Sequence, residues 1–308
     1  MAGLPPASAA GASVTGKVAV IGLGAMGSRM AKRLLDAGYT VVGWNRSPAT
    51  ATAFAESGGR LAATPAEAAA QVETLIVTVS DPAALVAVTE APDGILSGIR
   101  PSAQLIVMAT VGLAAIERLV SVAPANVDLV DAPVLGSVAE AAQGSLRIFA
   151  GGSLRSVQRA MPLLAVLGAV TRVGGLGAGS AAKLMANGAL FGVLSLLGES
   201  LALAQALGLS RETAFEVLAA TPLAEQAKRR RPALDAGEFA TRFRLSHARK
   251  DADLLLAAAE SAGSDVRLAR ATRSWLVDAE QSGWAEKDYT AILAQILGAS
   301  PLGRPKIE

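Results

Sequence analysis

The sequence predicts two domains, an N-terminal α/β domain built on a parallel sheet and a C-terminal domain made only of helices. In the first half of the chain, short apolar β-branched runs alternate with Ala-rich helical segments, a pattern typical of sheets covered by helices on both faces. Glycines between Val173 and Gly179 then allow the chain to turn. Beyond them no convincing strand is present, and one long apolar helix opens the second domain.

The first predicted strand, residues 17–22, is a β-branched run that ends in glycine. A helix with apolar residues at helical spacing follows at 25–37, and Gly38 ends it. The other predicted strands share the same short apolar pattern and lie at 40–45, 75–79, 105–108, 127–130 and 146–150. Helices are expected in the second domain at 179–207, 211–220, 248–262, 267–281 and 288–297.

These elements place the α/β domain at residues 16–178 and the all-helical domain at 179–300. Residues 1–15 are Ala, Ser, Gly and Pro with few other residues. They lack the charged and apolar regions of a secretory signal, so we expect a disordered tail there. A second tail is expected at 301–308.

Composition excludes several kinds of chemistry. The chain of 308 residues has no cysteine and one histidine, which excludes disulfides, thiolate nucleophiles, Cys-containing zinc sites and multi-histidine metal sites. We therefore predict no metal. The net charge of +2 gives no electrostatic reason to expect nucleic acid as a partner.

One segment, residues 184–209, is almost wholly apolar and has to be weighed as a membrane span. Glu199 and several glycines interrupt it, whereas a bilayer span needs about 20 apolar residues without a central charge. A helix that is apolar all round is also typical of the interior of a large soluble protein. We therefore expect no membrane association and a cytoplasmic protein.

A phosphate-binding turn is predicted between the first strand and the first helix. Gly22-Leu23-Gly24-Ala25-Met26-Gly27 has the pattern G-x-G-x-x-G. Gly22 permits the tight turn, Gly24 lets a pyrophosphate approach the backbone, and Gly27 allows close helix–strand packing. In this context of strand, turn and helix, the motif predicts a Rossmann domain that binds a dinucleotide.

The end of the second strand indicates which dinucleotide. NAD sites usually place Asp or Glu there, on the ribose 2′-hydroxyl. This chain has Asn45, Arg46 and Ser47 instead. Arg46 can pair with a 2′-phosphate or stack on adenine, and its two neighbours can donate hydrogen bonds. The pattern favours NADP.

Hydride transfer to a carbonyl requires a proton donor near the developing alkoxide. The single histidine, His247, lies in a charged stretch and is predicted to be at the surface. Lys183 is more promising, because it lies in the first turns of the most apolar helix. Asn187 follows four residues later on the same helical face. The alternative is a lysine that extends from a helix end into solvent.

At this point the sequence resembles a known family, the β-hydroxyacid dehydrogenases, which includes 3-hydroxyisobutyrate and 6-phosphogluconate dehydrogenases. The resemblance runs in order across nearly the whole chain and rests on residues 20–31, 131–137, 144–146, 151–152, 177–187, 250–251 and 287–291. It implies a Rossmann domain, a helical domain that forms a homodimer, and a small-molecule substrate.

The resemblance also implies a role for each matching residue. Lys183 would be the general acid/base, and Asn187 would hold a substrate oxygen. The substrate loop would consist of Leu135, Gly136 and Ser137. The residues implied beside the nicotinamide or the substrate carboxylate are Val79, Ser80, Thr110 and Lys250.

The chain departs from the family in its substrate loop. The usual pattern is Pro-Val-Ser-Gly-Gly, but here Leu135 replaces the serine and Ser137 replaces the second glycine. The leading hypothesis is an NADP(H)-dependent oxidoreductase that interconverts a small aldehyde or keto acid and a β-hydroxy acid. The first alternative is an NADPH-dependent imine reductase, although those enzymes commonly carry Asp or Tyr at the position of Lys183.

The second alternative is a non-catalytic protein that binds NADP or nucleic acid. Its support is the basic run Lys228-Arg229-Arg230-Arg231. Few aromatic residues accompany this run, so a solvated helix end is the preferred interpretation.

Overall fold

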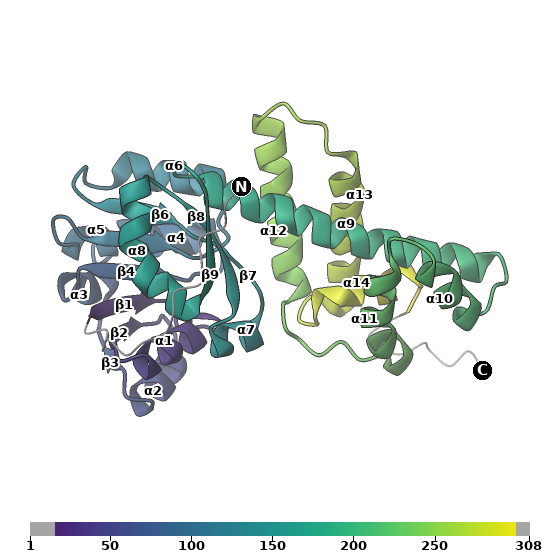
Figure 1. Ribbon diagram of the computed structural model, residues 1–308, viewed down its shortest axis with the longest axis horizontal. Coiled ribbons are helices and arrows are strands. Elements are labelled where there is room, and N and C mark those ends of the chain that lie inside the picture. The colour runs from purple at the N-terminus through teal and green to yellow at the C-terminus, as the bar shows by residue number, and fades with distance from the viewer. Residues whose placement is uncertain (1–15, 300–308) are drawn as a thin grey trace.

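The computed structural model describes residues 16–299 and divides them into two domains joined by one long helix (Figure 1). The predicted tails at 1–15 and 301–308 lie outside the described residues. The α/β domain has a Rossmann-like, mostly parallel sheet with helices on both faces. The second domain consists of helices packed around α9 (Ala178–Ala206).

The sheet has nine strands in the order β3-β2-β1-β4-β5-β6-β8-β7, with β9 paired to β8. Strands β1 to β6 run parallel to one another. The change of direction in strand order falls between β1 and β4, where open α/β sheets bind their ligands. The strands are β1 (Lys17–Ile21), β2 (Thr40–Trp44), β3 (Arg60–Leu61), β4 (Thr74–Val77), β5 (Gln104–Val107), β6 (Asp128–Asp131), β7 (Val134–Leu135), β8 (Leu146–Gly151) and β9 (Gly168–Gly174).

Alternating side chains of the central strands feed two separate cores. In β1, Val18 and Val20 pack in the core beneath α1 and α8, whereas Ala19 and Ile21 pack in the core beneath α3, α4 and α6. This two-sided burial explains why the strands are continuous apolar runs. The helices are α1 (Gly27–Asp36), α2 (Pro48–Glu56), α3 (Pro65–Ala70), α4 (Pro82–Glu90), α5 (Ile95–Gly98), α6 (Leu113–Val122), α7 (Val138–Gln143) and α8 (Leu154–Leu167).

The edge of the sheet departs from the purely parallel arrangement that the sequence predicts. The strand predicted at 146–150 is β8, and it runs antiparallel to β6 and β7. The short connection through α7 is a hairpin-like return and not a crossover, so the direction reverses. Strand β9 was not predicted, because most of its residues are half-buried or exposed and its sequence has no apolar run.

The helical domain follows directly. Strand β9 ends at Gly174 and α9 begins at Ala178. The elements after α9 are α10 (Arg211–Ala219), α11 (Ala224–Ala236), α12 (Leu245–Ser261), α13 (Arg267–Ala279), the π-helical turn η1 (Glu280–Trp284), the 3₁₀ turn η2 (Tyr289–Ala291) and α14 (Ile292–Ile296). Helix α11 was missed because it combines a charged run with an internal proline, Pro232.

Helix α9 is the central element of this domain and packs against α12, α13 and α14. It is long and apolar enough to cross a membrane by length and composition alone, with a mean hydropathy of 1.5. Phe191, Leu194, Leu197 and Leu201 of this helix are buried in the helical core. Packing within the domain therefore accounts for the apolar residues on this face of the helix.

Candidate active site

The phosphate turn has the geometry that the glycine pattern predicts. Gly22 has φ +98°, and a Cβ on Gly27 would lie 1.9 Å from the Gly22 carbonyl oxygen. Gly24 is different, because a Cβ there would meet nothing within 4 Å. Among residues 16–299, no side chain caps the first turn of α1. The turn therefore leaves open backbone and a helix N-terminus, as a dinucleotide pyrophosphate requires.

The end of β2 supports this turn. The Asn45 Oδ1 atom accepts a hydrogen bond of 2.9 Å from the Leu23 backbone N–H, and its Nδ2 atom donates to the Ser47 carbonyl at 3.2 Å. Asn45 is thus engaged in holding the turn. Arg46 and Ser47 are exposed beside it, so their side chains are free to meet the adenosine end of a dinucleotide. No carboxylate occupies positions 45–47.

A threonine that the sequence analysis did not select also holds the turn. The Thr78 hydroxyl donates a 2.5 Å hydrogen bond to the Gly22 carbonyl. It would also lie 2.3 Å from a Cβ on Gly27. Thr78 therefore links the end of β4 to the turn. Its only signal in the sequence is a hydroxyl at the end of an apolar strand.

The residues predicted near the nicotinamide lie just past the carboxyl ends of β4 and β5. Val79 and Ser80 follow β4, and the Ser80 hydroxyl donates to Asp81 Oδ2 at 2.6 Å. Thr110 follows β5, and its carbonyl accepts a 2.6 Å hydrogen bond from Lys250 Nζ. Because Lys250 belongs to α12, this bond joins the helical domain to the Rossmann domain at the predicted cofactor edge.

A charged cluster lies where α9 and α12 meet. Lys183 and Asn187 are buried on one face of α9, and Asp251 of α12 is 1% exposed. The Asn187 Nδ2 atom donates to Asp251 Oδ2 at 2.7 Å, and Lys250 Nζ lies 2.8 Å from Asp251 Oδ1. Helix α12 thereby brings Asp251 to Asn187 on α9 and Lys250 to Thr110 in the Rossmann domain.

Burial determines the electrostatics of this cluster. Loss of hydration is the largest effect on the Lys183 ammonium and lowers its pKa from 10.5 to about 8. The Asp251 carboxylate opposes this change, whereas the Lys250 charge reinforces it. Burial also raises the pKa of Asp251, against the two lysines. A lysine with a pKa of about 8 can both hold and release a proton near neutral pH.

The sequence predicts His247 at the surface, and this prediction is wrong. His247 is half-buried near the start of α12, with its ring 6.0 Å from that of Phe243. Burial, followed by the Lys250 charge, lowers its pKa. Helix α12, which contains His247, packs this charged stretch against α9, and the local sequence does not reveal that contact.

The predicted substrate loop is closed on itself by a capping box. Both the Ser137 backbone N–H and its hydroxyl donate to Glu140 Oε2, at 2.8 and 2.6 Å. These hydrogen bonds lower the pKa of Glu140, and the Arg242 charge adds to the effect. Leu135 is half-exposed and pairs with Arg147 across β7 and β8. The loop thus presents an apolar side chain and a carboxylate, with its serine donors already engaged.

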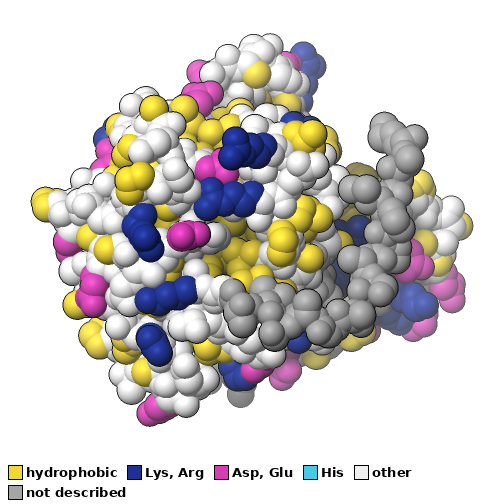
Figure 2. Space-filling model, turned by 60° about the vertical axis from the view of Figure 1, so that its left-hand side comes forward, with side chains coloured by type: hydrophobic (Ala, Val, Ile, Leu, Met, Phe, Trp, Pro, Cys, Tyr) yellow, Lys and Arg dark blue, Asp and Glu magenta, His cyan; other side chains and the backbone are white. Residues whose placement is uncertain are grey.

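The basic run lies on α11, and two of its four residues, Arg230 and Arg231, have side-chain partners. Arg230 donates to the Tyr289 hydroxyl at 3.1 Å, and Arg231 pairs with Glu212 and Asp235 at 3.3 Å each. Elsewhere, the Rossmann face in Figure 2 intersperses its basic side chains with acidic and uncharged ones.

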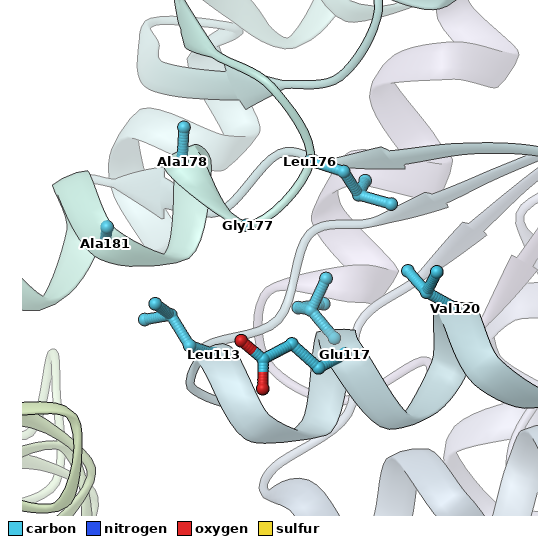
Figure 3. A pocket seen from close by; sticks show the side chains of 8 residues that line it. Leu113, Glu117, Val120, Leu176, Gly177, Ala178 and Ala181 are labelled. Carbon is cyan, nitrogen blue, oxygen red and sulfur yellow. The ribbon is translucent and has the colours of Figure 1, made fainter. Parts of the chain in front are cut away.

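An apolar groove of about 520 Å³ lies at the start of α9 (Figure 3). Leu113, Glu117 and Val120 of α6 form one wall, and Leu176 and Ala181 lie across from them. Ala181 is two residues before Lys183, about 200° around the helix. The groove is therefore separate from the charged cluster.

Comparison with known proteins identifies both halves of the chain. Residues 17–175 match the NAD binding domain of 6-phosphogluconate dehydrogenase, and residues 177–296 match the NAD-binding domain of NADP-dependent 3-hydroxyisobutyrate dehydrogenase. The chain belongs to the β-hydroxyacid dehydrogenase family. It is an NAD(P)-dependent oxidoreductase of that family and acts on CH–OH groups.

Individual members of the family align along nearly their whole length. Glyoxylate/succinic semialdehyde reductase 1 of Arabidopsis thaliana is 28% identical over 283 residues, covering 91% of this chain and 98% of the relative. The Mycobacterium tuberculosis 3-hydroxyisobutyrate dehydrogenase structure with L-serine has a TM-score of 0.83 at 25% identity, covering 92% and 99%. An imine reductase from Pseudomonas sp. has a TM-score of 0.57 at 25% identity, again covering 92% and 99%.

Proposed function

We propose that this β-hydroxyacid dehydrogenase uses NADP(H) and that Lys183 is its general acid/base. The observation that carries the proposal is the buried Lys183 beside Asn187 and Asp251, in a cluster that Lys250 ties to the cofactor edge at Thr110. The reaction would interconvert a small aldehyde or keto acid and a β-hydroxy acid.

The preference for NADP rests on the end of β2. Arg46 is exposed one residue after Asn45, whose side chain is engaged by the phosphate turn. A 2′-phosphate placed there would meet a guanidinium and the Ser47 hydroxyl, and no carboxylate of positions 45–47 would repel it. NADPH and NADH titrations followed by nicotinamide fluorescence test this preference, and equal affinities would contradict it.

The nicotinamide supplies or accepts the hydride when it is bound. Lys183 would hold the proton that passes to the substrate oxygen, and Asn187 would orient that oxygen through the amide proton that Asp251 does not take. With a pKa of about 8, Lys183 is mainly protonated at pH 7. Carbonyl reduction should therefore slow as pH rises through about 8, and alcohol oxidation should speed up over the same interval.

Replacing the lysine tests its role. Lys183→Met retains most of the apolar volume of the lysine stem and removes the proton donor. We expect unchanged NADPH affinity and a loss of turnover of roughly 10²-fold or more. Near-normal turnover by Lys183→Met would reject Lys183 as the acid.

The substrate loop favours keeping imine reduction as a second candidate. The engagement of both Ser137 donors by Glu140 leaves few groups to bind a substrate carboxylate, and Leu135 suits an apolar substituent. A panel of small aldehyde acids and cyclic imines, followed at the NADPH absorbance band, separates the two. Turnover of imines alone would contradict the β-hydroxy acid assignment while leaving the family assignment intact.

We further propose a homodimer formed through α9. Large apolar side chains of α9 remain exposed on one side, including Met185 at 73%, Leu196 at 49% and Leu203 at 60%. A second copy would cover them, because a soluble protein rarely leaves so long an apolar stripe in water. Light scattering of Leu203→Glu should give a monomer where the wild type gives a dimer. A monomeric wild type would refute the proposal.

A further inference from the structure

The start of α9 is held by a carboxylate from the Rossmann domain. Asp131, the last residue of β6, is 1% exposed. Its Oδ1 atom accepts a 3.0 Å hydrogen bond from the Gly177 N–H, and its Oδ2 atom accepts one of 2.7 Å from the Ser180 N–H. The residue at the N-cap position of α9 is Gly177, which has no side chain to serve as a cap. Asp131 performs that function from 46 residues away.

The surrounding backbone is shaped around this carboxylate. A Cβ on Gly151 of β8 would lie 2.2 Å from Asp131 Oδ1, and a Cβ on Gly179 would lie 2.9 Å from Oδ2. The Cβ on Gly179 would also approach the Asp131 carbonyl oxygen to 2.3 Å. Strand β8 and helix α9 thus approach Asp131 so closely that only glycine fits at these two positions. We call this contact between β6, β8 and α9 the junction.

The junction lies between the two halves of the predicted site. Asp131 is in register with Val107 of β5, three residues before Thr110 at the cofactor edge. On the other side, Ser180 lies three residues before Lys183, which is about 4.5 Å along the helix axis. Beyond that turn, α9 packs within the helical domain. The Asp131 contact therefore sets where Lys183 lies relative to the end of the sheet.

We propose that Asp131 is a positioning residue that places the Lys183 ammonium against the nicotinamide edge by anchoring the first turn of α9 to β6. This inference rests on the proposed role of Lys183. Asp131 would anchor α9, whereas the predicted substrate loop at residues 135–137, which follows it closely in sequence, would contact the substrate. Asp131 is not a proton donor to substrate, because both carboxylate oxygens face backbone amides of α9.

The proposal predicts an effect on the pH dependence of reduction. The charged groups that act on Lys183 are Asp251 and Lys250, both on α12, and Asp131 is not among them. Removing the anchor should not change the Lys183 pKa through charge. A loosened first turn would instead admit water to Lys183, and hydration raises the pKa of a buried ammonium. The descending limb of the reduction profile should then move to higher pH.

Asp131→Asn is the first test. The amide can accept from only one of the two α9 N–H groups, because its nitrogen is a donor. We expect kcat for reduction to fall roughly 10-fold or more, since a displacement of 1 Å can cost about 10²-fold. The descending limb should move up by about half a pH unit or more. NADPH affinity should stay within about threefold, since the phosphate turn is remote from Asp131 in the sheet.

Two further variants separate positioning from stability. Gly151→Ala retains the Asp131 carboxylate but shifts it, because the new Cβ would lie 2.2 Å from Oδ1 and 2.7 Å from both the Gly175 carbonyl oxygen and the Gly179 nitrogen. It disturbs the same anchor from β8, and should reproduce the kcat loss and the pH displacement even where Asp131→Asn folds poorly. Ser210→Ala is the matched control, because the Ser210 hydroxyl caps α10 by accepting from Thr213 N at 3.1 Å, away from the site. It should lower the melting temperature without changing the pH profile, with kcat normalised to bound NADPH.

The outcomes are distinct. Asp131→Asn and Gly151→Ala variants that merely melt earlier, with the same normalised kcat and profile as Ser210→Ala, would overturn the positioning role. Lys183→Met run in parallel tests the role on which it depends. If that variant stays active, the proposed function fails and the inference fails with it. If Lys183→Met is inactive and both anchor variants are unaffected, only the inference fails.

Discussion

Asp251→Asn should move the reduction profile to lower pH. Asp251 is the group that holds the Lys183 pKa up, against burial and the Lys250 charge. Asparagine has nearly the same shape, and its Oδ1 atom can still accept the 2.7 Å hydrogen bond from Asn187. The substitution therefore removes a charge from the cluster while retaining the contact between α9 and α12.

The expected size follows from the pKa of about 8. An opposite charge a few ångströms away changes a pKa by about 1 to 3, so loss of Asp251 should lower that of Lys183 to about 7 or below. At pH 8 the protonated fraction would fall from about one half to about one tenth, and reduction would slow roughly fivefold. At pH 6 the lysine stays mainly protonated, and the rate should change much less.

The assay is NADPH oxidation under saturating cofactor at half-unit pH steps between 6 and 10, with the substrate identified from the panel. Lys250→Met provides a control of opposite sign, because it removes the positive charge that lowers the Lys183 pKa. Its descending limb should move to higher pH, although its lost hydrogen bond to Thr110 should also weaken cofactor binding. Limbs that stay in place in both variants, or move in the reverse directions, would refute the electrostatic account of Lys183.

Three further predictions concern the cofactor and the substrate loop. Gly24→Ala should unfold at the wild-type temperature, because its Cβ meets nothing within 4 Å. It should nevertheless bind NADPH roughly 10-fold more weakly (about 1.4 kcal/mol). Gly27→Ala should instead be destabilised, because its Cβ would lie 1.9 Å from the Gly22 carbonyl oxygen. Arg46→Glu should weaken NADPH by roughly 10-fold or more and leave NADH nearly unchanged, measured by fluorescence titration. Glu140→Gln retains an acceptor for Ser137 but removes the loop's negative charge, so KM for a carboxylate substrate should fall severalfold while KM for a neutral imine stays constant. A uniform change for both substrates would point to loop distortion.

Much of the fold follows from local patterns. Because strands buried on both faces are mostly apolar, β1, β2, β4 and β5 were visible as short β-branched or aliphatic runs. The phosphate turn was equally visible, since its glycines are required by contacts with residues a few positions away and with one neighbouring strand. The exposed strand β9 and the charged helix α11 were missed, because tertiary contacts and not their own patterns stabilise them.

The candidate site residues also divide into those that the sequence indicates and those that only tertiary contacts reveal. Lys183 was selected from sequence because a charge inside the most apolar helix is anomalous wherever that helix packs. Asp251, Asp131 and Glu140 were not selected as site residues, since each is an ordinary carboxylate until a distant segment meets it. Asn187 lies 64 residues from Asp251, and Ser180 lies 49 residues from Asp131.

The amino-acid sequence by itself determined the two-domain division, the dinucleotide turn and the lysine, because burial and backbone conformation impose those residue types locally. Only the tertiary structure decided that Ser137 donates to Glu140, that His247 is half-buried, and that Asp131 caps α9. Hydrogen bonds and charges act over a few ångströms in space, and the partners involved are set by how β6, α7, α9 and α12 pack.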